Sequence, residues 1–233
     1  MVSIVIRLKN EDEWLDRCLN AIYWQDYQKF EVIVVENEAT EKSLAVAARY
    51  PVEVVSISNS DFTYGRALNL GFARARGEYV VCLSGHCIPT NNLWLTNLRR
   101  AFTDAHIAAV YGRQEPLPDS HIFDKRDLWY TFGTERKVQR KDSFFHNANS
   151  MIRRSVWEHI PFREELPGLE DRAFSHAVIS AGYTVIYEPK ASVYHHHGIF
   201  QEMEAERCRR TVNIIESLDA QHGYDLVADS SRK

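Results

Sequence analysis

Two adjacent acidic residues, Glu170 and Asp171, stand just before a segment whose pattern predicts a helix. A carboxylate held in place can take the proton of an attacking hydroxyl group, which is otherwise a poor nucleophile at neutral pH. Acidic residues are also common in the first turn of helices, where they complement the helix dipole. The two residues alone leave both interpretations open.

A group of histidines is the second candidate for chemistry. His195 and His197 alternate at the end of a predicted strand, so both imidazoles face one side of it while His196 faces away. Imidazole nitrogens bind divalent metal ions or form hydrogen bonds with anions. The alternative is that these histidines only lie at a hydrated strand end.

The elements that position these residues alternate between strands and helices in the first part of the chain. Strands are predicted at residues 2–6, 30–35, 52–57 and 79–83, and helices after Asn10 and at residues 41–49 and 65–76. This alternation of apolar strands with amphipathic helices predicts an α/β fold with a parallel sheet, whose ligands bind at the carboxyl ends of the strands. Two such ends are polar, at Glu36-Asn37-Glu38 and at Ser84-Gly85-His86.

The second part of the chain is less regular. A helix is predicted at 94–102 and a strand at 107–111, followed by an irregular stretch, 114–142, which we expect to be a functional loop or to contain short helices of its own. Order resumes at 144–153, with a helix at 169–181, strands at 183–187 and 191–195, and a helix at 202–222 that carries Arg207, Arg209 and Arg210.

Composition bounds the class of protein. The 233 residues are 45% hydrophobic, which is ample for a buried core, and the net charge of -4 argues against non-specific nucleic-acid binding. No C-x-x-C pair occurs, so we expect Cys18, Cys82, Cys87 and Cys208 to be reduced thiols. No basic leader and no apolar stretch of about 18 residues is found, which predicts a cytoplasmic protein without a membrane span.

Several segments carry a family resemblance through their order and spacing. In the first part these are Val2-Ser-Ile-Val-Ile6, Asn10-Glu11, Cys18-Leu19, Phe30-Glu-Val-Ile-Val-Val35, Arg66-Ala-Leu-Asn69, Gly71 and Ala75-Arg-Gly-Glu-Tyr79. In the second part they are Asn147-Ala-Asn-Ser-Met-Ile-Arg-Arg154, Pro161-Phe162, Leu169-Glu-Asp171, Ala181-Gly-Tyr183 and Val193-Tyr-His-His-His197. They resemble glycosyltransferase family 2, and the second set resembles its rhamnosyltransferase-like branch.

The resemblance covers about residues 2–200 and implies the GT-A fold, a Rossmann-like, mostly parallel sheet flanked by helices. It also implies three regions. These are a nucleotide-sugar-binding half (1–112), an acceptor-binding and catalytic half of the same domain (113–200), and a C-terminal helix and tail (201–233).

The family's nucleotide site implies roles for two pairs of residues. Glu36 and Asn37 stand where the family has a pair of Asp residues, so they are expected to contact the nucleotide. Arg66 and Asn69 lie one turn apart at the start of a helix and could face the same ligand.

The family's metal site is altered in this chain. Members commonly carry Asp-x-Asp after the fourth strand, whereas Ser84, Gly85 and His86 stand here and are expected to border the nucleotide. Two alternatives follow. Either a divalent metal is held by His86, His195 and His197, with manganese preferred to magnesium, or no metal is tightly held and the histidines bind the diphosphate directly.

Catalytic roles follow from the resemblance in the second half. Asp171 matches the base of an inverting transfer, and Glu170 would bind the acceptor or orient Asp171. Asn147 and Asn149, at alternating positions, could line the acceptor site. Three aromatic residues of the irregular stretch could stack on a sugar or form a small separate core, namely Trp129, Tyr130 and Phe132.

The function implied is transfer of a sugar from a nucleotide-sugar donor to a hydroxyl of a saccharide or lipid-linked saccharide, in bacterial-type surface polysaccharide or glycolipid synthesis. The branch suggests a deoxysugar on dTDP as the donor.

A dehydrogenase is excluded because no G-x-G-x-x-G follows the first strand. A non-catalytic nucleotide- or sugar-binding protein remains the alternative, because Asp-x-Asp is missing. Contact of the C-terminal arginines with the inner face of a membrane is also left open.

Overall fold

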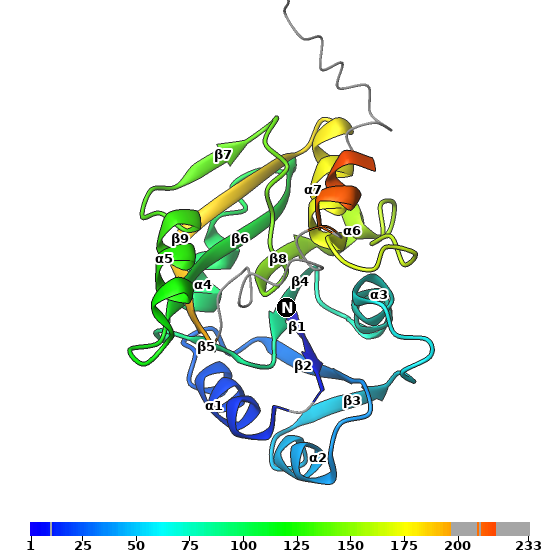
Figure 1. Ribbon diagram of the computed structural model, residues 1–233, viewed down its shortest axis with the longest axis vertical. Helices are drawn as coiled ribbons and strands as arrows, with labels where there is room; N and C mark the ends of the chain where they lie inside the picture. Colours follow the sequence, from blue (N-terminus) through cyan, green and yellow to red (C-terminus); the bar gives the residue numbers. More distant parts are fainter. Residues whose placement is uncertain (10, 197–208, 210, 218–233) are drawn as a thin grey trace, which may run out of the picture.

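The structure is a computed structural model that describes residues 1–9, 11–196, 209 and 211–217. Its strands form one sheet, and its helices pack around that sheet (Figure 1). The strands are β1 (Val2–Leu8), β2 (Phe30–Glu36), β3 (Val52–Ser56), β4 (Tyr79–Ser84), β5 (Cys87–Pro89), β6 (Ile107–Pro116), β7 (Lys137–Gln139), β8 (Asn149–Arg153) and β9 (Thr184–His195). The helices are α1 (Asp12–Tyr23), α2 (Glu41–Ala47), α3 (Tyr64–Arg74), α4 (Trp94–Arg100), α5 (Ile122–Thr131), α6 (Arg154–Trp157) and α7 (Glu170–Ser180).

Strand order in the described sheet is β3-β2-β1-β4-β8-β6-β9-β5, with β7 also paired to β9. The strands β1 to β4 run parallel to one another, and β6 runs parallel to β9. The strand β8 lies antiparallel between β4 and β6, and β5 and β7 are antiparallel to β9. The α/β prediction is confirmed, and each antiparallel pair of the described sheet contains β8 or β9, which come from the second half of the chain.

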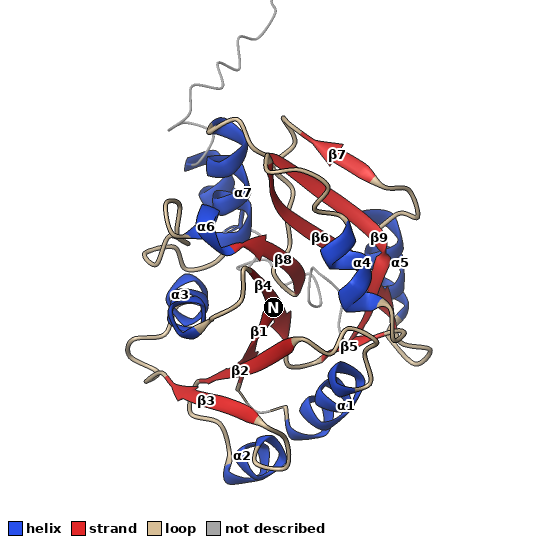
Figure 2. Cartoon of the chain, turned by 180° about the vertical axis from the view of Figure 1, so that it is seen from behind, coloured by secondary structure: helices blue, strands red, loops and turns tan. Residues whose placement is uncertain are grey.

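Two apolar layers hold helices on the two faces of the sheet (Figure 2). Along β1, Ile4 and Ile6 join the layer under α1 and α4, and Val5 joins the layer under α3 and α7, as the two-residue period of a strand requires. Gly71 lets α3 approach β1, because a Cβ at this position would lie 2.4 Å from a methyl carbon of Val5. Alternate residues of β1 therefore pack against different sets of helices, one set on each face of the sheet.

The segment 114–142 contains regular structure of its own. The strand β6 continues to Pro116, and the helix α5 and the strand β7 follow it. The two strands expected at 183–187 and 191–195 are one strand, β9, whose register against β6 shifts between Gly112 and Gln114. A bulge absorbs the irregular residues in the middle of β9 without ending the strand.

The C-terminal helix expected at 202–222 lies mostly outside the described residues, as do Asn10, Arg207 and Arg210. Residues 211–217 are helical, and Ile214 packs against Leu166 and Ala173. The thiols of Cys18, Cys82 and Cys87 are free and buried, as expected, and Cys208 lies outside the described residues. None of the described helices has the length and apolar character to cross a lipid bilayer.

Candidate active site

The carboxyl ends of β1, β2 and β4 meet at one edge of the sheet. Arg7 on β1 pairs in register with Ser84 on β4, and Leu8 pairs with Glu36 on β2. The polar turns that follow β2 and β4 therefore lie on either side of Arg7. This is the edge at which parallel α/β sheets bind ligands.

The two carboxylates of α7 reach this edge. Leu169 adopts φ of 58°, a left-handed conformation that costs roughly 1–2 kcal/mol for a residue with a side chain, and Glu170 begins the helix directly after it. Glu170 and Asp171 are only 4% and 9% exposed. The guanidinium of Arg7 lies 3.6 Å from a carboxylate oxygen of Glu170, which connects the end of β1 to the start of α7.

Asn147 donates hydrogen bonds to both carboxylates. Its backbone N–H donates to Asp171 Oδ2 at 3.3 Å, and its side-chain amide donates to Glu170 Oε1, also at 3.3 Å. The backbone N–H of Arg172 donates to Asp171 Oδ1 at 2.7 Å. Asn147 thus contacts both residues of the predicted catalytic pair. Its role in binding the acceptor stays a prediction.

Burial governs the protonation of the pair. It raises the pKa of Asp171 and of Glu170, and for Glu170 the neighbouring Asp171 charge raises the pKa further. The Arg7 cation opposes this rise at both carboxylates. A carboxylate with a raised pKa is a stronger base once it is ionised, which suits it to accept a proton from a hydroxyl group.

Glu36 and Asn37 are buried at the end of β2. Glu36 Oε2 accepts a hydrogen bond from the backbone N–H of Ala39 at 2.9 Å. The side-chain amide of Asn37 donates to the carbonyl of Ile57 at 3.2 Å, whereas its buried Oδ1 has no partner within the described chain. An unpaired buried acceptor is costly unless a ligand or water satisfies it, so Asn37 presents an acceptor for a donor N–H or hydroxyl.

Arg66 and Asn69 share one face of α3, as predicted, but that face meets residues 162–164. Asn69 donates to the Phe162 carbonyl and to Glu164, and it accepts from Trp157 and the Phe162 N–H. These four bonds use both amide hydrogens and both lone pairs of the oxygen, so Asn69 has nothing left for a nucleotide. Arg66 pairs with Glu164 at 3.0 Å, and nucleotide contact by Arg66 stays a prediction.

The side chain of Asn149 forms hydrogen bonds within the protein and connects β8 to neighbouring segments. Its amide donates to the carbonyls of Ala191 at 2.8 Å and Arg113 at 3.1 Å, and its oxygen accepts from the indole of Trp94 at 2.9 Å. It is fully buried at the first position of β8. The alternation that suggested a shared role with Asn147 fails because Asn147 precedes the strand.

The histidines converge next to the Ser84-Gly85-His86 turn. His86 Nε2 lies 3.0 Å from His195 Nε2, and the rings stack with centroids 5.0 Å apart. The strand pair β5–β9 sets this contact, because Cys87 is in register with His195. His196 packs on the ring of Trp14 instead, in line with the prediction that it faces away, and His197 lies outside the described residues.

His86, Cys87 and His195 offer ligand atoms that all lie within 4.8 Å of one another. The two imidazoles are good ligands for a divalent ion. Burial raises the pKa of the Cys87 thiol well above its usual range, which disfavours the thiolate that binds metals. The residues present therefore fit a divalent cation that is bound by the two imidazole nitrogens rather than by the thiol.

Two residues at this edge were given no role by sequence reasoning. Glu11 contacts His86, with 2.5 Å between its Oε1 and the ring Nδ1, and Arg7 contacts Glu170 and also stacks over the ring of Tyr64. In the sequence, Glu11 was visible only as part of the family signature. The position of Glu11 and Arg7 near the carboxyl end of β1, a parallel strand, was the signal that could have identified both.

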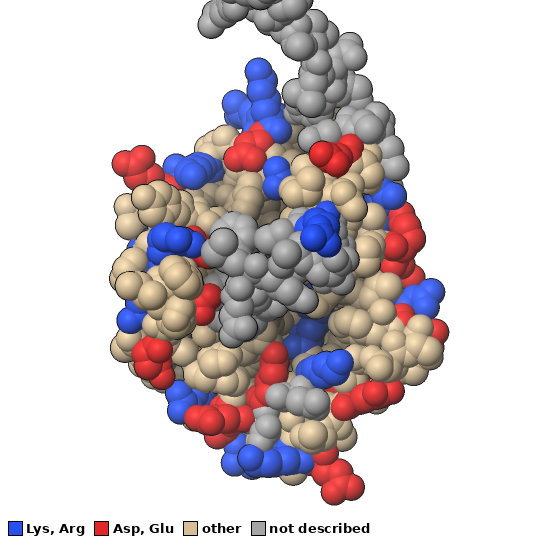
Figure 3. All heavy atoms as spheres, in the orientation of Figure 1, with Lys and Arg blue, Asp and Glu red and all other residues tan. Residues whose placement is uncertain are grey.

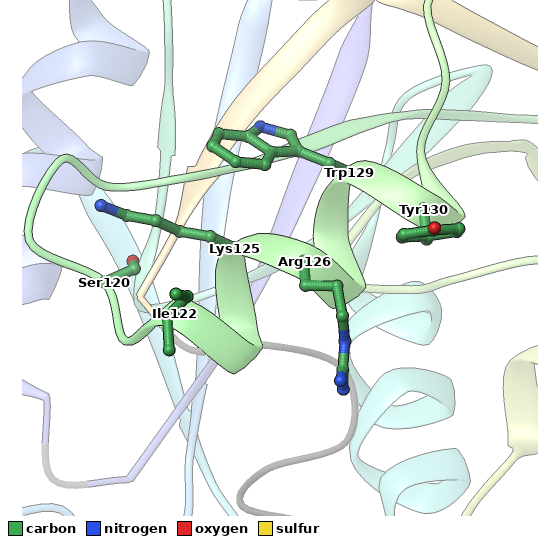
Figure 4. A pocket seen from close by; sticks show the side chains of 6 residues that line it. All are labelled: Ser120, Ile122, Lys125, Arg126, Trp129 and Tyr130. Carbon is green, nitrogen blue, oxygen red and sulfur yellow. The ribbon is translucent and has the colours of Figure 1, made fainter.

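A shallow groove of about 490 Å³ lies along α5 (Figure 4). Trp129 and Tyr130 line it with exposed fractions of 57% and 88%, together with Lys125 and Arg126. Phe132 is buried in the core against Tyr187, so it cannot stack on a sugar. On the face shown in Figure 3, the visible acidic and basic side chains of the described residues are interspersed and form no large basic area.

Comparison with known proteins decides the family. Residues 3–160 match Glycosyl transferase family 2. The chain belongs to this family. This family 2 chain is similar to the O-antigen chain rhamnosyltransferases WbaN of Salmonella anatum, 29% identical over 207 residues, and RfbN of Salmonella typhimurium, 26% identical over 218 residues. The matches cover 84% and 88% of this chain, which spans 64% and 69% of the two relatives' length.

Solved structures confirm the GT-A fold. The chain is similar to S. aureus TarS, which has also been solved with UDP, with a TM-score of 0.67 and 18% identity over 84% of this chain and 60% of that one. It is similar to the mannosyltransferase PcManGT from Pyrobaculum calidifontis, solved with GDP-Man and Mn²⁺, with a TM-score of 0.63 and 20% identity over 83% of this chain and 56% of that one.

Proposed function

We propose that this family 2 chain transfers a sugar from a nucleoside-diphosphate donor to a hydroxyl acceptor, with inversion at the anomeric carbon. The observation that carries the proposal is the buried Glu170–Asp171 pair, held by Asn147 and Arg7 beside the strand ends. Family membership supports it.

Asp171 acts as the base in a single displacement. The acceptor oxygen attacks the anomeric carbon while its proton passes to the Asp171 carboxylate, and the bond from that carbon to the diphosphate oxygen breaks. The nucleoside diphosphate leaves with the electron pair. Attack from the side opposite the leaving group inverts the centre. Glu170, held by Arg7, accepts a hydrogen bond from the acceptor or orients Asp171.

The donor lies along the carboxyl ends of β1, β2 and β4. Asn37 Oδ1 and Glu36 accept hydrogen bonds from the base or ribose, and the Ser84-Gly85-His86 turn borders the diphosphate. The similar TarS has been solved in complex with UDP, which supports a nucleotide as the ligand but does not assign its contacts.

His86 and His195 hold a divalent ion in this proposal, with manganese preferred because imidazole replaces the hard carboxylates. When bound, such an ion neutralises the charge that develops on the leaving diphosphate. The 3.0 Å separation of the two nitrogens and the Mn²⁺ in the PcManGT structure support it. The other arrangement is neutralisation by histidine or arginine alone.

The names of the relatives suggest the substrates. We propose a rhamnose or related deoxyhexose donor and a saccharide or lipid-linked saccharide acceptor of a surface polysaccharide. A cytoplasmic location stays a prediction.

A product assay tests the proposal. Nucleoside diphosphates and their sugars are titrated by calorimetry, and donors that bind are incubated with saccharide acceptors while the release of nucleoside diphosphate is followed. We expect binding, and transfer with inversion seen in the NMR coupling of the product. Binding without transfer would favour the non-catalytic alternative, which the missing Asp-x-Asp motivates.

A further inference from the structure

We propose that Glu11 is a positioning residue that keeps the proton of His86 on Nδ1, so that the lone pair of His86 lies on Nε2, the nitrogen that would bind a cation shared with His195. The inference deepens the proposed function and rests on the donor site described for it. Glu11 itself does not touch the substrate. It acts through the imidazole ring.

The first step is the contact between Glu11 and His86. Glu11 Oε1 lies 2.5 Å from His86 Nδ1. An ionised carboxylate has no hydrogen to donate, so the proton between the two atoms must come from the ring. A neutral imidazole carries one proton, and holding it on Nδ1 leaves the lone pair on Nε2.

The second step is what Nε2 faces. His195 Nε2 lies 3.0 Å away, at hydrogen-bonding distance, and the β5–β9 register fixes its position. With the His86 proton on Nδ1, His195 Nε2 is the donor and His86 Nε2 the acceptor of this bond when no ion is bound. Metal–nitrogen bonds of about 2.1 Å at a right angle put two nitrogens about 3.0 Å apart, so this separation suits two ligands of one ion. Histidines that bind metals commonly donate their other ring N–H to a carboxylate, as His86 does here.

The third step excludes an ordinary helix-end role for Glu11. It occupies the position just before α1, where a side chain often caps the helix, yet its side chain makes no capping hydrogen bond. Its second oxygen, Oε2, is buried and has no hydrogen-bond partner among the described residues. The carboxylate is therefore held at His86 rather than used to complete the helix.

Gly85 makes room for this arrangement. A Cβ at this position would lie 2.5 Å from Glu11 Oε2 and 3.2 Å from the carbonyl oxygen of Arg7. A side chain at position 85 would thus displace the Glu11 carboxylate, and the glycine leaves room for it. The family's carboxylate on the β4 turn is replaced here by one that comes from the β1 turn and acts through a histidine.

The position of the proton on the His86 ring is measured by ¹⁵N NMR on the metal-free protein. We expect Nδ1–H in the wild type and a loss of that preference in Glu11→Ala and Glu11→Gln. Gly85→Ala, which keeps Glu11 but displaces it, should act in the same direction. Glu13→Ala is the matched control, because Glu13 is an exposed acid of the same helix paired with Arg17.

Mn²⁺ binding is measured on the same proteins by electron paramagnetic resonance. We expect Glu11→Ala to weaken Mn²⁺ about 10- to 100-fold, as loss of a ligand's carboxylate partner does elsewhere, and Glu13→Ala to leave it unchanged. A wild-type proton on Nε2, an unchanged tautomer in the Glu11 variants, or a wild type that binds no Mn²⁺ would each overturn the inference. A wild type that shows the expected tautomer and Mn²⁺ binding but transfers no sugar would overturn only the proposed function.

Discussion

The guanidinium of Arg7, at the end of β1, lies 3.6 Å from the carboxylate of Glu170, at the start of α7. This contact joins residues far apart in sequence and sets a cation beside two buried acids. It lowers the pKa of both carboxylates against the effect of burial. Arg7 therefore controls the pH range in which the proposed base is ionised.

Arg7→Met should move the acid limb of the pH profile of kcat/KM to higher pH. Activity requires ionised Asp171 and falls as pH drops through the pKa of the coupled pair. Removing the cation raises that pKa, so activity is lost at a higher pH than in the wild type. Arg76→Met is the control, because Arg76 is exposed and pairs with Glu31. An acid limb that stays in place or moves to lower pH would contradict this role of Arg7.

Glu36→Ala should weaken binding of the correct nucleoside diphosphate about 10- to 100-fold, the range expected for a lost hydrogen bond to a charged group. The variant should remain folded, because Glu36 lies at the end of β2 and its side chain accepts a hydrogen bond from the nearby Ala39 N–H, a local contact. Calorimetry gives the dissociation constant. Glu41→Ala, an exposed acid at the start of α2, serves as control, and an unchanged constant for Glu36→Ala would remove Glu36 from the site.

Metal removal tests the histidine pair. Turnover should fall in EDTA and be restored by Mn²⁺ more fully than by Mg²⁺, because the ligands are imidazoles. His195→Ala should remove the response to Mn²⁺, whereas His159→Ala, an exposed histidine after α6, should retain it. Full turnover in EDTA would favour neutralisation of the diphosphate by protein side chains alone.

Trp129→Ala should raise the acceptor KM with little change in the donor KM, if the exposed indole on α5 stacks on the acceptor sugar. Steady-state kinetics with each substrate varied in turn provides the measurement. The matched control is Trp24→Ala, another exposed tryptophan, which follows α1. Equal acceptor KM values for the wild type and Trp129→Ala would exclude this contact.

The fold was predictable where the sequence carries a strong period. Apolar strands such as Val2–Leu8 and Phe30–Glu36 alternate with helices, and this pattern specifies the parallel half of the sheet and its polar edge. The antiparallel insertion of β8 was not predictable, because a short buried strand carries no signal of its direction. The single strand β9 was divided in the prediction because the irregular residues near Pro189 resemble a turn.

Parts of the site depended on contacts that no local pattern contains. Glu170 and Asp171 were recognised from a motif, but their proximity to Arg7 and Asn147 depends on tertiary packing. Asn69 was expected at the nucleotide, yet its amide is saturated by residues about 90 positions later in the chain. The spacing of residues along a helix predicts which of them share a face of the helix, but it does not predict which segment packs against that face.

Asp171→Asn tests the central claim most directly, because it keeps the shape of the side chain and removes its basicity. Turnover should fall about 10²- to 10⁴-fold, as for loss of a general base, with nucleotide affinity within about twofold of the wild type. Asp119→Asn, at an exposed position before α5, should leave both unchanged. Near-normal turnover in Asp171→Asn, or a product that retains the donor's anomeric configuration, would contradict the account.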